Sequence, residues 1–125
     1  MRQVLIDSDI LIEVSRARDR AVLAHWEELI RQEVPILCSP VTVAELWHGA
    51  RPKENSELEA LFAAIPCIPI DYEIARRAGD YLRDYRRSHH VELADALIAA
   101  TASIHKLKLW TRNRRHYPMA DVLFF

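Results

Sequence analysis

Short apolar runs alternate with longer amphipathic stretches along most of the chain. Gln3 to Ile6 is an apolar run that ends in Asp7-Ser8-Asp9, and the residues from Ile10 to Ser15 then follow a helical pattern. Strands that alternate with helices in this way favour a parallel sheet with helices on both faces. The pattern therefore predicts an α/β protein.

Cap residues mark where two of the later helices begin. Ser39 stands at an N-cap position with Pro40 at the first helical position, which predicts a helix to about Ala50. Asp71 is expected to cap a further helix. The remaining predicted helices are Arg20–Arg31, Glu54–Ala64, Tyr72–Arg87 and Val91–His105. The remaining predicted strands are Val34–Cys38, Lys108–Thr111, Asp121–Phe125 and Pro66–Ile70, the last at an edge because of its prolines.

Length and composition narrow the architecture. The chain has 125 residues, half of them hydrophobic, which fits one domain over residues 1–125 with a substantial core. No apolar run approaches the roughly 18 residues of a membrane span, so we expect a cytoplasmic protein without membrane contact. Cys38 and Cys67 lie in separate apolar segments, and we expect both to be buried free thiols.

Charge is nearly balanced overall but unevenly distributed. A net charge of −1 argues against a nucleic-acid binder held by bulk positive charge. Of the 17 basic residues 14 are Arg, and they gather at 16–20, 83–90 and 112–116. Arg presents a planar fork of donors that matches phosphate. We expect the first cluster to be solvated surface and the last, which follows an apolar strand, to be functional.

Carboxylates stand in apolar surroundings at three places in the sequence. Asp7 follows the first strand, Glu45 lies among apolar residues of the helix after Ser39, and Asp95 shares the apolar face of its helix. A buried carboxylate is costly unless something positive meets it. Ligands of open α/β sheets collect at the carboxyl ends of the strands. A divalent metal site is therefore the leading interpretation.

Structural roles remain open for each of these acidic residues. Asp7 and Asp9 are both candidates to cap the helix that follows the first strand, and Asp9 suits this role better. Glu45 shares a helix face with Thr42 and His48 and could hydrogen-bond to either. Asp95 could pair with a buried Arg or satisfy the N-terminus of its own helix.

Four segments in this order resemble the PIN-domain ribonucleases, specifically the VapC-like toxins of type II toxin–antitoxin pairs. The segments are Leu5–Ile12, Ser39–Leu46, Ala94–Ala102 and Thr111–Asn113, and the resemblance spans nearly the whole chain. It implies a three-layer α/β/α sandwich around a central, mostly parallel sheet. It also implies an endoribonuclease that depends on Mg²⁺ or Mn²⁺, a cognate antitoxin as partner, and a homodimer.

The resemblance also implies roles for individual residues. Asp7, Glu45 and Asp95 match the three acidic metal-site positions of the family, and Ser8 matches its small hydroxyl residue beside the first. Asn113 is the further catalytic candidate, because it stands near the fourth position.

The chain departs from the family pattern at two places. Many relatives place an acidic residue shortly after the Thr-Arg-Asn segment, whereas this chain has Asn113 and then His116. One fewer negative charge weakens the occupancy of a second metal, which argues against a two-metal mechanism. His90 stands where relatives often have Gly, and the sequence offers no physical account of it.

These residue types suit the hydrolysis of a phosphodiester. Mg²⁺ prefers oxygen ligands and keeps several waters, and it can orient a water and stabilise charge on phosphate. The mechanistic hypothesis is in-line attack by a metal-activated water. Ser8 and Thr111 are predicted to contact the substrate, and Arg112 or Arg114 is predicted to neutralise the phosphate.

Two rival interpretations come from other functional classes. A receiver-like signalling domain would use Asp7, Asp9, Asp71 and Thr111 around a phosphorylated Asp, but it leaves Glu45 without a role. The link from the strand before Thr111 to the last strand is also too short for its crossover helix. A non-catalytic partner-binding module would instead receive an Arg of another protein among the same carboxylates.

Overall fold

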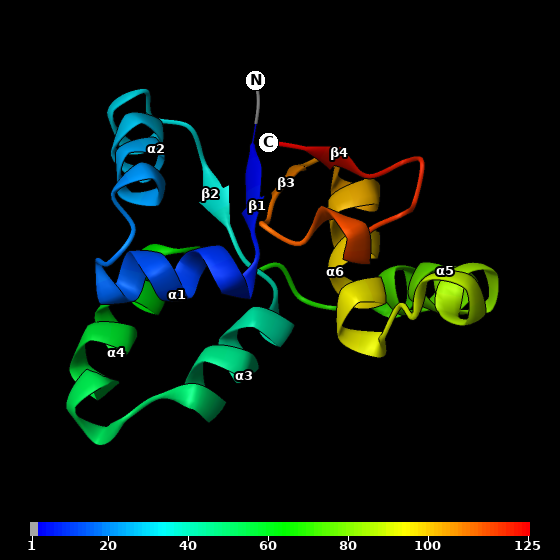
Figure 1. Ribbon diagram of the computed structural model, residues 1–125, viewed down its shortest axis with the longest axis horizontal. Coiled ribbons are helices and arrows are strands. Elements are labelled where there is room, and N and C mark those ends of the chain that lie inside the picture. The colour runs from blue at the N-terminus through cyan, green and yellow to red at the C-terminus, as the bar shows by residue number, and fades with distance from the viewer. Residues whose placement is uncertain (1–2) are drawn as a thin grey trace.

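A four-stranded parallel sheet forms the centre of the computed structural model, which describes residues 3–125 (Figure 1). The strand order is β2-β1-β3-β4. Every pairing is parallel, and β1 contacts both β2 and β3. The strands are β1 Val4–Ile6, β2 Ile36–Leu37, β3 Lys108–Trp110 and β4 Leu123–Phe124. The predicted parallel sheet is confirmed.

Helices cover both faces of the sheet, as Figure 1 shows, because alternate residues of β1 face opposite ways. Val4 and Ile6 belong to one buried cluster, and Leu5 belongs to the other. The first cluster packs under α1 Ser8–Arg16, α2 Arg20–Arg31, α3 Pro40–Gly49 and α4 Asn55–Ala64, and the second under α5 Tyr72–His89 and α6 Leu93–His105. Two 3₁₀ turns, η1 Pro52–Glu54 and η2 Arg114–His116, complete the elements. This is the expected three-layer α/β/α sandwich.

The predicted caps are present. The Ser39 hydroxyl accepts a hydrogen bond from the Val41 amide at 3.1 Å, with Pro40 at the first position of α3. The Asp71 carboxylate accepts one from the Ile74 amide at 2.9 Å, so it fixes the start of α5. These side chains satisfy backbone donors that the helices leave unpaired.

Two helix starts differ from the predictions and change the place of the acidic residues. The first helix begins at Ser8 rather than Ile10, because Asp7 and not Asp9 is its N-cap residue. The helix predicted from Val91 begins at Leu93, which moves Asp95 from the helix interior to the first turn.

The predicted edge strand Pro66–Ile70 is wrong as a strand. Only one bridge forms, between Cys38 and Cys67, flanked by the Cys38 amide on Pro66 O at 3.0 Å and the Ile68 amide on Cys38 O at 2.9 Å. Pro66 and Pro69 have no amide hydrogen, so the ladder cannot continue. Both thiols are free as expected, but only Cys38 is buried; Cys67 is exposed because it lies on this unextended edge.

His90 has an unusual backbone conformation, which explains why glycine would suit this position. It ends α5 with φ 55° and ψ 34°, in the left-handed region that favours glycine. Glycine, which the family resemblance led us to expect there, would adopt this conformation without the penalty of a Cβ atom. Ala17 and Lys106 end α1 and α6 in the same way, with φ of 52° and 55°.

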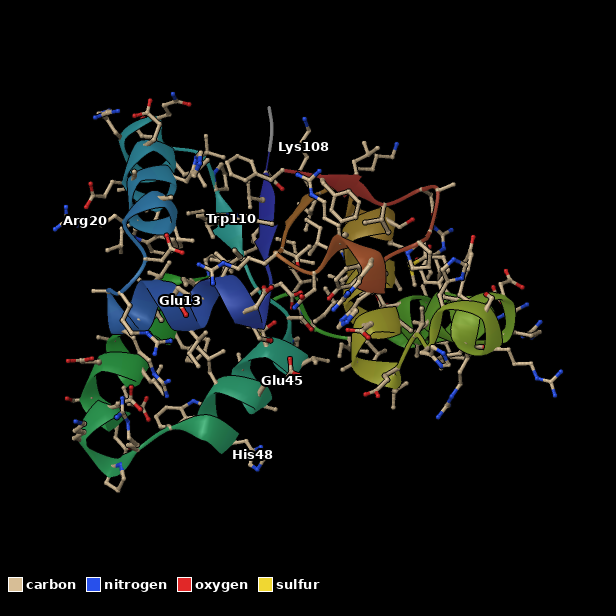
Figure 2. The ribbon with its side chains drawn as sticks, viewed as in Figure 1. Glu13, Arg20, Glu45, His48, Lys108 and Trp110 are labelled. Carbon is tan, nitrogen blue, oxygen red and sulfur yellow. The ribbon has the colours of Figure 1, made fainter. Side chains whose placement is uncertain are left out.

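The first Arg cluster lies on the surface, as expected. Arg16 pairs with Glu54 at 3.2 Å and Arg18 with Glu13 at 2.8 Å. Arg20 points outward from α2 (Figure 2). No helix within residues 3–125 combines the length and apolar character needed to cross a membrane.

Candidate active site

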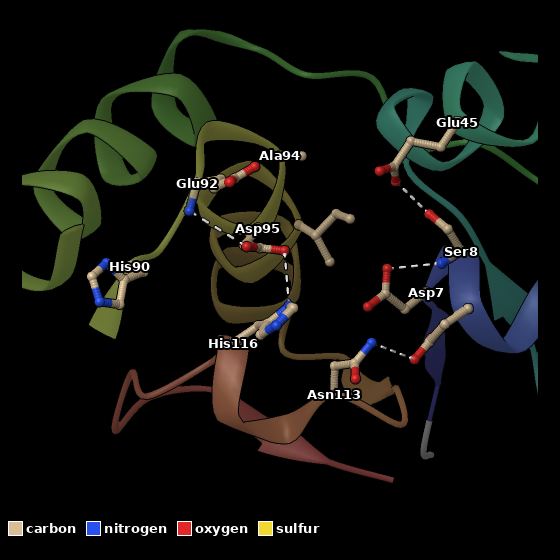
Figure 3. Close-up of a pocket in the computed structure, with 11 residues that line it drawn as sticks. Asp7, Ser8, Glu45, His90, Glu92, Ala94, Asp95, Asn113 and His116 are labelled. Carbon is tan, nitrogen blue, oxygen red and sulfur yellow. Dashed lines mark hydrogen bonds and ion pairs between the residues drawn. The ribbon is translucent and has the colours of Figure 1, made fainter. Parts of the chain in front are cut away.

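An open pocket of about 480 Å³ lies where the carboxyl end of β1 meets the first turns of α1 and α6 (Figure 3). Side chains from segments far apart in sequence converge on it, and five of them are carboxylates: Asp7, Asp9, Glu45, Glu92 and Asp95. The other lining residues are Ser8, His90, Ala94, Ile98, Asn113 and His116. The pocket is therefore rich in negative charge.

Asp7 is the best-anchored of these carboxylates and is only 7% exposed. Its Oδ1 accepts a hydrogen bond from the Ser8 amide at 2.8 Å. Its Oδ2 accepts two, from the Thr111 hydroxyl at 2.9 Å and from the Tyr117 hydroxyl at 2.7 Å. These bonds fix the orientation of the carboxylate at the floor of the pocket.

Glu45 reaches the pocket from α3 and accepts a hydrogen bond from the Ser8 hydroxyl, as Figure 3 shows. The expectation that Glu45 lies in apolar surroundings is wrong, because the residue is exposed on the open side of the pocket. Thr42 is fully buried and does not bind Glu45; its hydroxyl has no hydrogen-bond partner among residues 3–125.

Asp95 combines a structural contact with a place in the pocket. Its Oδ2 accepts a hydrogen bond from the Glu92 amide at 3.4 Å. Asp95 therefore helps to cap its own helix, as the structural alternative for this residue proposed. Its Oδ1 lies 3.9 Å from Nδ1 of His116. Burial raises the pKa of Asp95, and the charge of Asp7 adds to this, although the Glu92 amide and His116 act in the opposite direction.

Asp9 organises the loop after β3. Its Oδ2 accepts hydrogen bonds from the Arg112 amide at 2.9 Å and from Nδ2 of Asn113 at 3.2 Å. Its Oδ1 is buried and has no partner among residues 3–125. Burial raises the pKa of Asp9, and the nearby charge of Asp7 raises it further. Asp9 therefore belongs to the site rather than to the helix cap that its sequence position suggested.

The predicted substrate residues divide into two groups. Ser8 and Asn113 line the pocket, and Thr111 lies just beneath it against Asp7. Arg112 and Arg114 lie outside the lining. Arg112 pairs with Asp19, with Glu13 3.9 Å away. Arg114 lies over the Phe124 ring, at 5.0 Å from its centroid, and donates to the Phe125 carbonyl at 3.2 Å.

Several residues of the site were missed by the sequence reasoning. Glu92 and His116 line the pocket, and Tyr117 supports it from the core. A signal existed for Glu92, because an acidic residue three positions before Asp95 forms a capping box with it. Nothing in the local pattern around Tyr117 pointed to a partner 110 residues away.

The donor set of the pocket fits a hard divalent cation. Carboxylate oxygens are the ligands that Mg²⁺ prefers, and the repulsion of Asp7 with Asp9 and with Asp95 favours a cation beside them. Within residues 3–125, no three His, Cys, Asp or Glu side chains are grouped closely enough to hold a metal ion together. An open site is nevertheless suited to Mg²⁺, because this ion keeps several waters and is commonly held by one or two carboxylates together with a substrate phosphate.

Comparison with known proteins identifies the family. Residues 4–122 match the family model described as the PIN domain. The chain belongs to the PIN-domain family. The PIN chain is 44% identical over 123 residues to Ribonuclease VapC10 of Mycobacterium tuberculosis, an alignment that covers 96% of this chain and 90% of the relative.

Solved structures with a similar fold agree with this assignment. The crystal structure of FitAcB from Neisseria gonorrhoeae matches with a TM-score of 0.76 and 30% identity, covering 98% of this chain and 96% of that one. DNA-bound VapBC from Salmonella typhimurium matches with a TM-score of 0.83 over 100% of this chain and 98% of that one, at 17% identity, which supports the fold.

Membership of the PIN family removes the receiver-like interpretation. Asp71, its phosphoacceptor candidate, caps α5 and is not among the residues that line the pocket with Asp7. The segments that carried the family resemblance, by contrast, supply Asp7, Glu45, Asp95 and Asn113 to one pocket.

Proposed function

We propose that this chain, acting as a single domain over residues 1–125, is a metal-dependent endoribonuclease and the toxin of a toxin–antitoxin pair. The observation that carries the proposal is the convergence of Asp7, Glu45 and Asp95 on one open pocket in a PIN fold. The identity to a relative named a ribonuclease, over 96% of this chain, supports RNA as the substrate class.

In this proposal Asp7, Glu45 and Asp95 hold Mg²⁺ or Mn²⁺. When bound, such an ion lowers the pKa of a coordinated water and neutralises charge on the phosphate that is attacked in line. Ser8 orients Glu45 through its hydroxyl. Asn113, whose Nδ2 donates to Asp9 at 3.2 Å, would contact the substrate or a water held by the cation.

Substrate binding requires positive charge near a pocket that itself repels phosphate. Arg112 and Arg114 are adjacent to Asn113 in sequence and are the proposed phosphate contacts. Arg112 would have to exchange its pairing with Asp19 for the RNA. The side chains of that ion pair are 43% exposed for Arg112 and 33% exposed for Asp19. Such an exposed pair contributes little to the free energy of folding, so breaking it costs little.

Regulation by a cognate antitoxin is part of the same proposal. A basic side chain inserted among the carboxylates would displace the cation and leave the fold intact. The relatives support this assignment, because they include a protein named Toxin FitB, 31% identical over 98% of this chain. We further propose a homodimer and a cytoplasmic location.

Metal-dependent cleavage of a structured RNA pool by purified protein tests the proposal. We expect cleavage with Mg²⁺ or Mn²⁺ that is lost in EDTA and lost in Asp95→Asn. Asp121→Asn is the matched control, because Asp121 is an acidic residue that lies outside the pocket lining. Undiminished cleavage by Asp95→Asn would sink the assignment. An absence of both cleavage and metal binding by calorimetry would favour the non-catalytic partner-binding module.

A further inference from the structure

Tyr117 is a core residue whose side-chain hydroxyl reaches Asp7, one of the residues that line the acidic pocket. It follows η2, is 3% exposed, and its ring packs in the cluster that lies under α5 and α6. Its hydroxyl donates to Oδ2 of Asp7 at 2.7 Å. The Thr111 hydroxyl donates to the same oxygen at 2.9 Å.

Because of these two donors, the two carboxylate oxygens of Asp7 differ in the number of lone pairs that remain free. A carboxylate oxygen has about two lone-pair sites, so Thr111 and Tyr117 together occupy those of Oδ2. Among residues 3–125, Oδ1 accepts one hydrogen bond, from the Ser8 amide at 2.8 Å. One lone pair of Oδ1 is therefore the part of Asp7 that remains free to meet a cation.

We propose that Tyr117 is a positioning residue that holds Asp7 so that it binds the divalent cation through Oδ1 alone. This inference rests on the proposed function, because it concerns the same site. Tyr117 touches neither the cation nor the RNA; it acts through Asp7. Together with Thr111 it sets both the rotation of the carboxylate and the number of oxygens that Asp7 offers.

A packing role alone does not explain the hydroxyl. Phe has the same ring and would fill the same space, so the ring accounts for the burial of Tyr117 but not for its polar atom. A buried hydroxyl needs a partner, and this one finds Asp7 rather than a backbone carbonyl.

Tyr117→Phe isolates this effect, and Tyr81→Phe is its matched control. Tyr81 is also a buried tyrosine, 7% exposed, and its hydroxyl also donates to a carboxylate at 2.7 Å, but that carboxylate belongs to Asp121, outside the pocket. Both variants lose one hydroxyl and one hydrogen bond of the same length. Only the first loses a bond to the pocket.

The experiment is titration calorimetry of Mn²⁺ into the RNA-free protein, with thermal unfolding in EDTA beside it. We expect Tyr117→Phe to weaken Mn²⁺ binding about tenfold, the lower end of the loss seen when an outer-shell partner is removed. Tyr81→Phe should bind Mn²⁺ as the wild type does. In RNA cleavage, the Mn²⁺ midpoint of Tyr117→Phe should rise by the same factor, and saturating Mn²⁺ should restore the rate.

Thr111→Val provides a second test if Tyr117→Phe folds poorly. It removes the other donor to Oδ2 and should weaken Mn²⁺ binding in the same direction. Unchanged Mn²⁺ affinity in Tyr117→Phe, or an equal loss in Tyr81→Phe, would overturn the inference. A wild-type protein that neither binds Mn²⁺ nor cleaves RNA in its presence would overturn the proposed metal-dependent function itself, and with it this inference.

Discussion

A buried, charged carboxylate in the pocket lowers the stability of the metal-free protein. The pKa of Asp95 lies above its ordinary value of 3.8, mainly because of burial. A raised pKa means that the folded protein holds this proton more tightly than the unfolded chain does. The contribution of the protonated carboxyl to the free energy of unfolding is complete below pH 3.8 and is lost as the pH rises through the raised value. At pH 7 the charged group is therefore a net cost to the metal-free protein.

Asp95→Asn is accordingly expected to raise the melting temperature of the metal-free protein at pH 7, with a smaller difference below pH 4. Asp121→Asn should instead lower the melting temperature at pH 7. Burial opposes ionisation at Asp121, but hydrogen bonds from Ser103 and Tyr81 outweigh it and lower the pKa of this carboxyl. Thermal unfolding of both variants in EDTA, at pH 7 and below pH 4, tests these two predictions. A lower melting temperature for Asp95→Asn at pH 7 would contradict the argument.

At the scale of elements, the helix ends carry a small and local strain. Three helices, α1, α5 and α6, end on a residue other than Gly in the left-handed region. The left-handed conformation costs roughly 1–2 kcal/mol for a residue with a Cβ atom. His90 at the end of α5 lines the pocket, whereas Ala17 at the end of α1 is exposed and away from it.

Ala17→Gly is therefore expected to stabilise the fold by about 0.5–1 kcal/mol, which is the strain relieved less the added backbone freedom of the unfolded chain. Ala60→Gly is the matched control, because Ala60 is exposed in the interior of α4, where Gly should cost about 1 kcal/mol. Urea unfolding of both variants measures the two changes. Destabilisation by Ala17→Gly would show that its left-handed conformation carries no strain.

The whole molecule should respond to a metal that binds only the folded state. If the pocket holds Mn²⁺, a free concentration 100 times the dissociation constant should add about 2.7 kcal/mol to the free energy of unfolding. Asp7→Asn removes the carboxylate at the floor of the pocket and should abolish most of this gain. Differential scanning calorimetry of the wild type and of Asp7→Asn, with and without Mn²⁺, measures this gain in stability. Equal gains in the wild type and in Asp7→Asn would place the binding outside the pocket.

Local signals predicted much of the fold and the central part of the site. The order of the elements, the parallel sheet and the caps at Ser39 and Asp71 follow from hydrophobic period and turn chemistry, which act over a few residues. Asp7 and Asp95 were identifiable because a carboxylate beside apolar residues is costly wherever the chain goes.

Only the tertiary structure decided which distant groups meet. The prolines at 66 and 69 left a bridge in place of a strand, and Cys67 became exposed. Arg112 was turned toward Asp19. Tyr117 came to share Oδ2 of Asp7 with Thr111 across more than 100 residues of chain. Such contacts depend on strand register and helix packing, which join segments whose local patterns carry no information about each other.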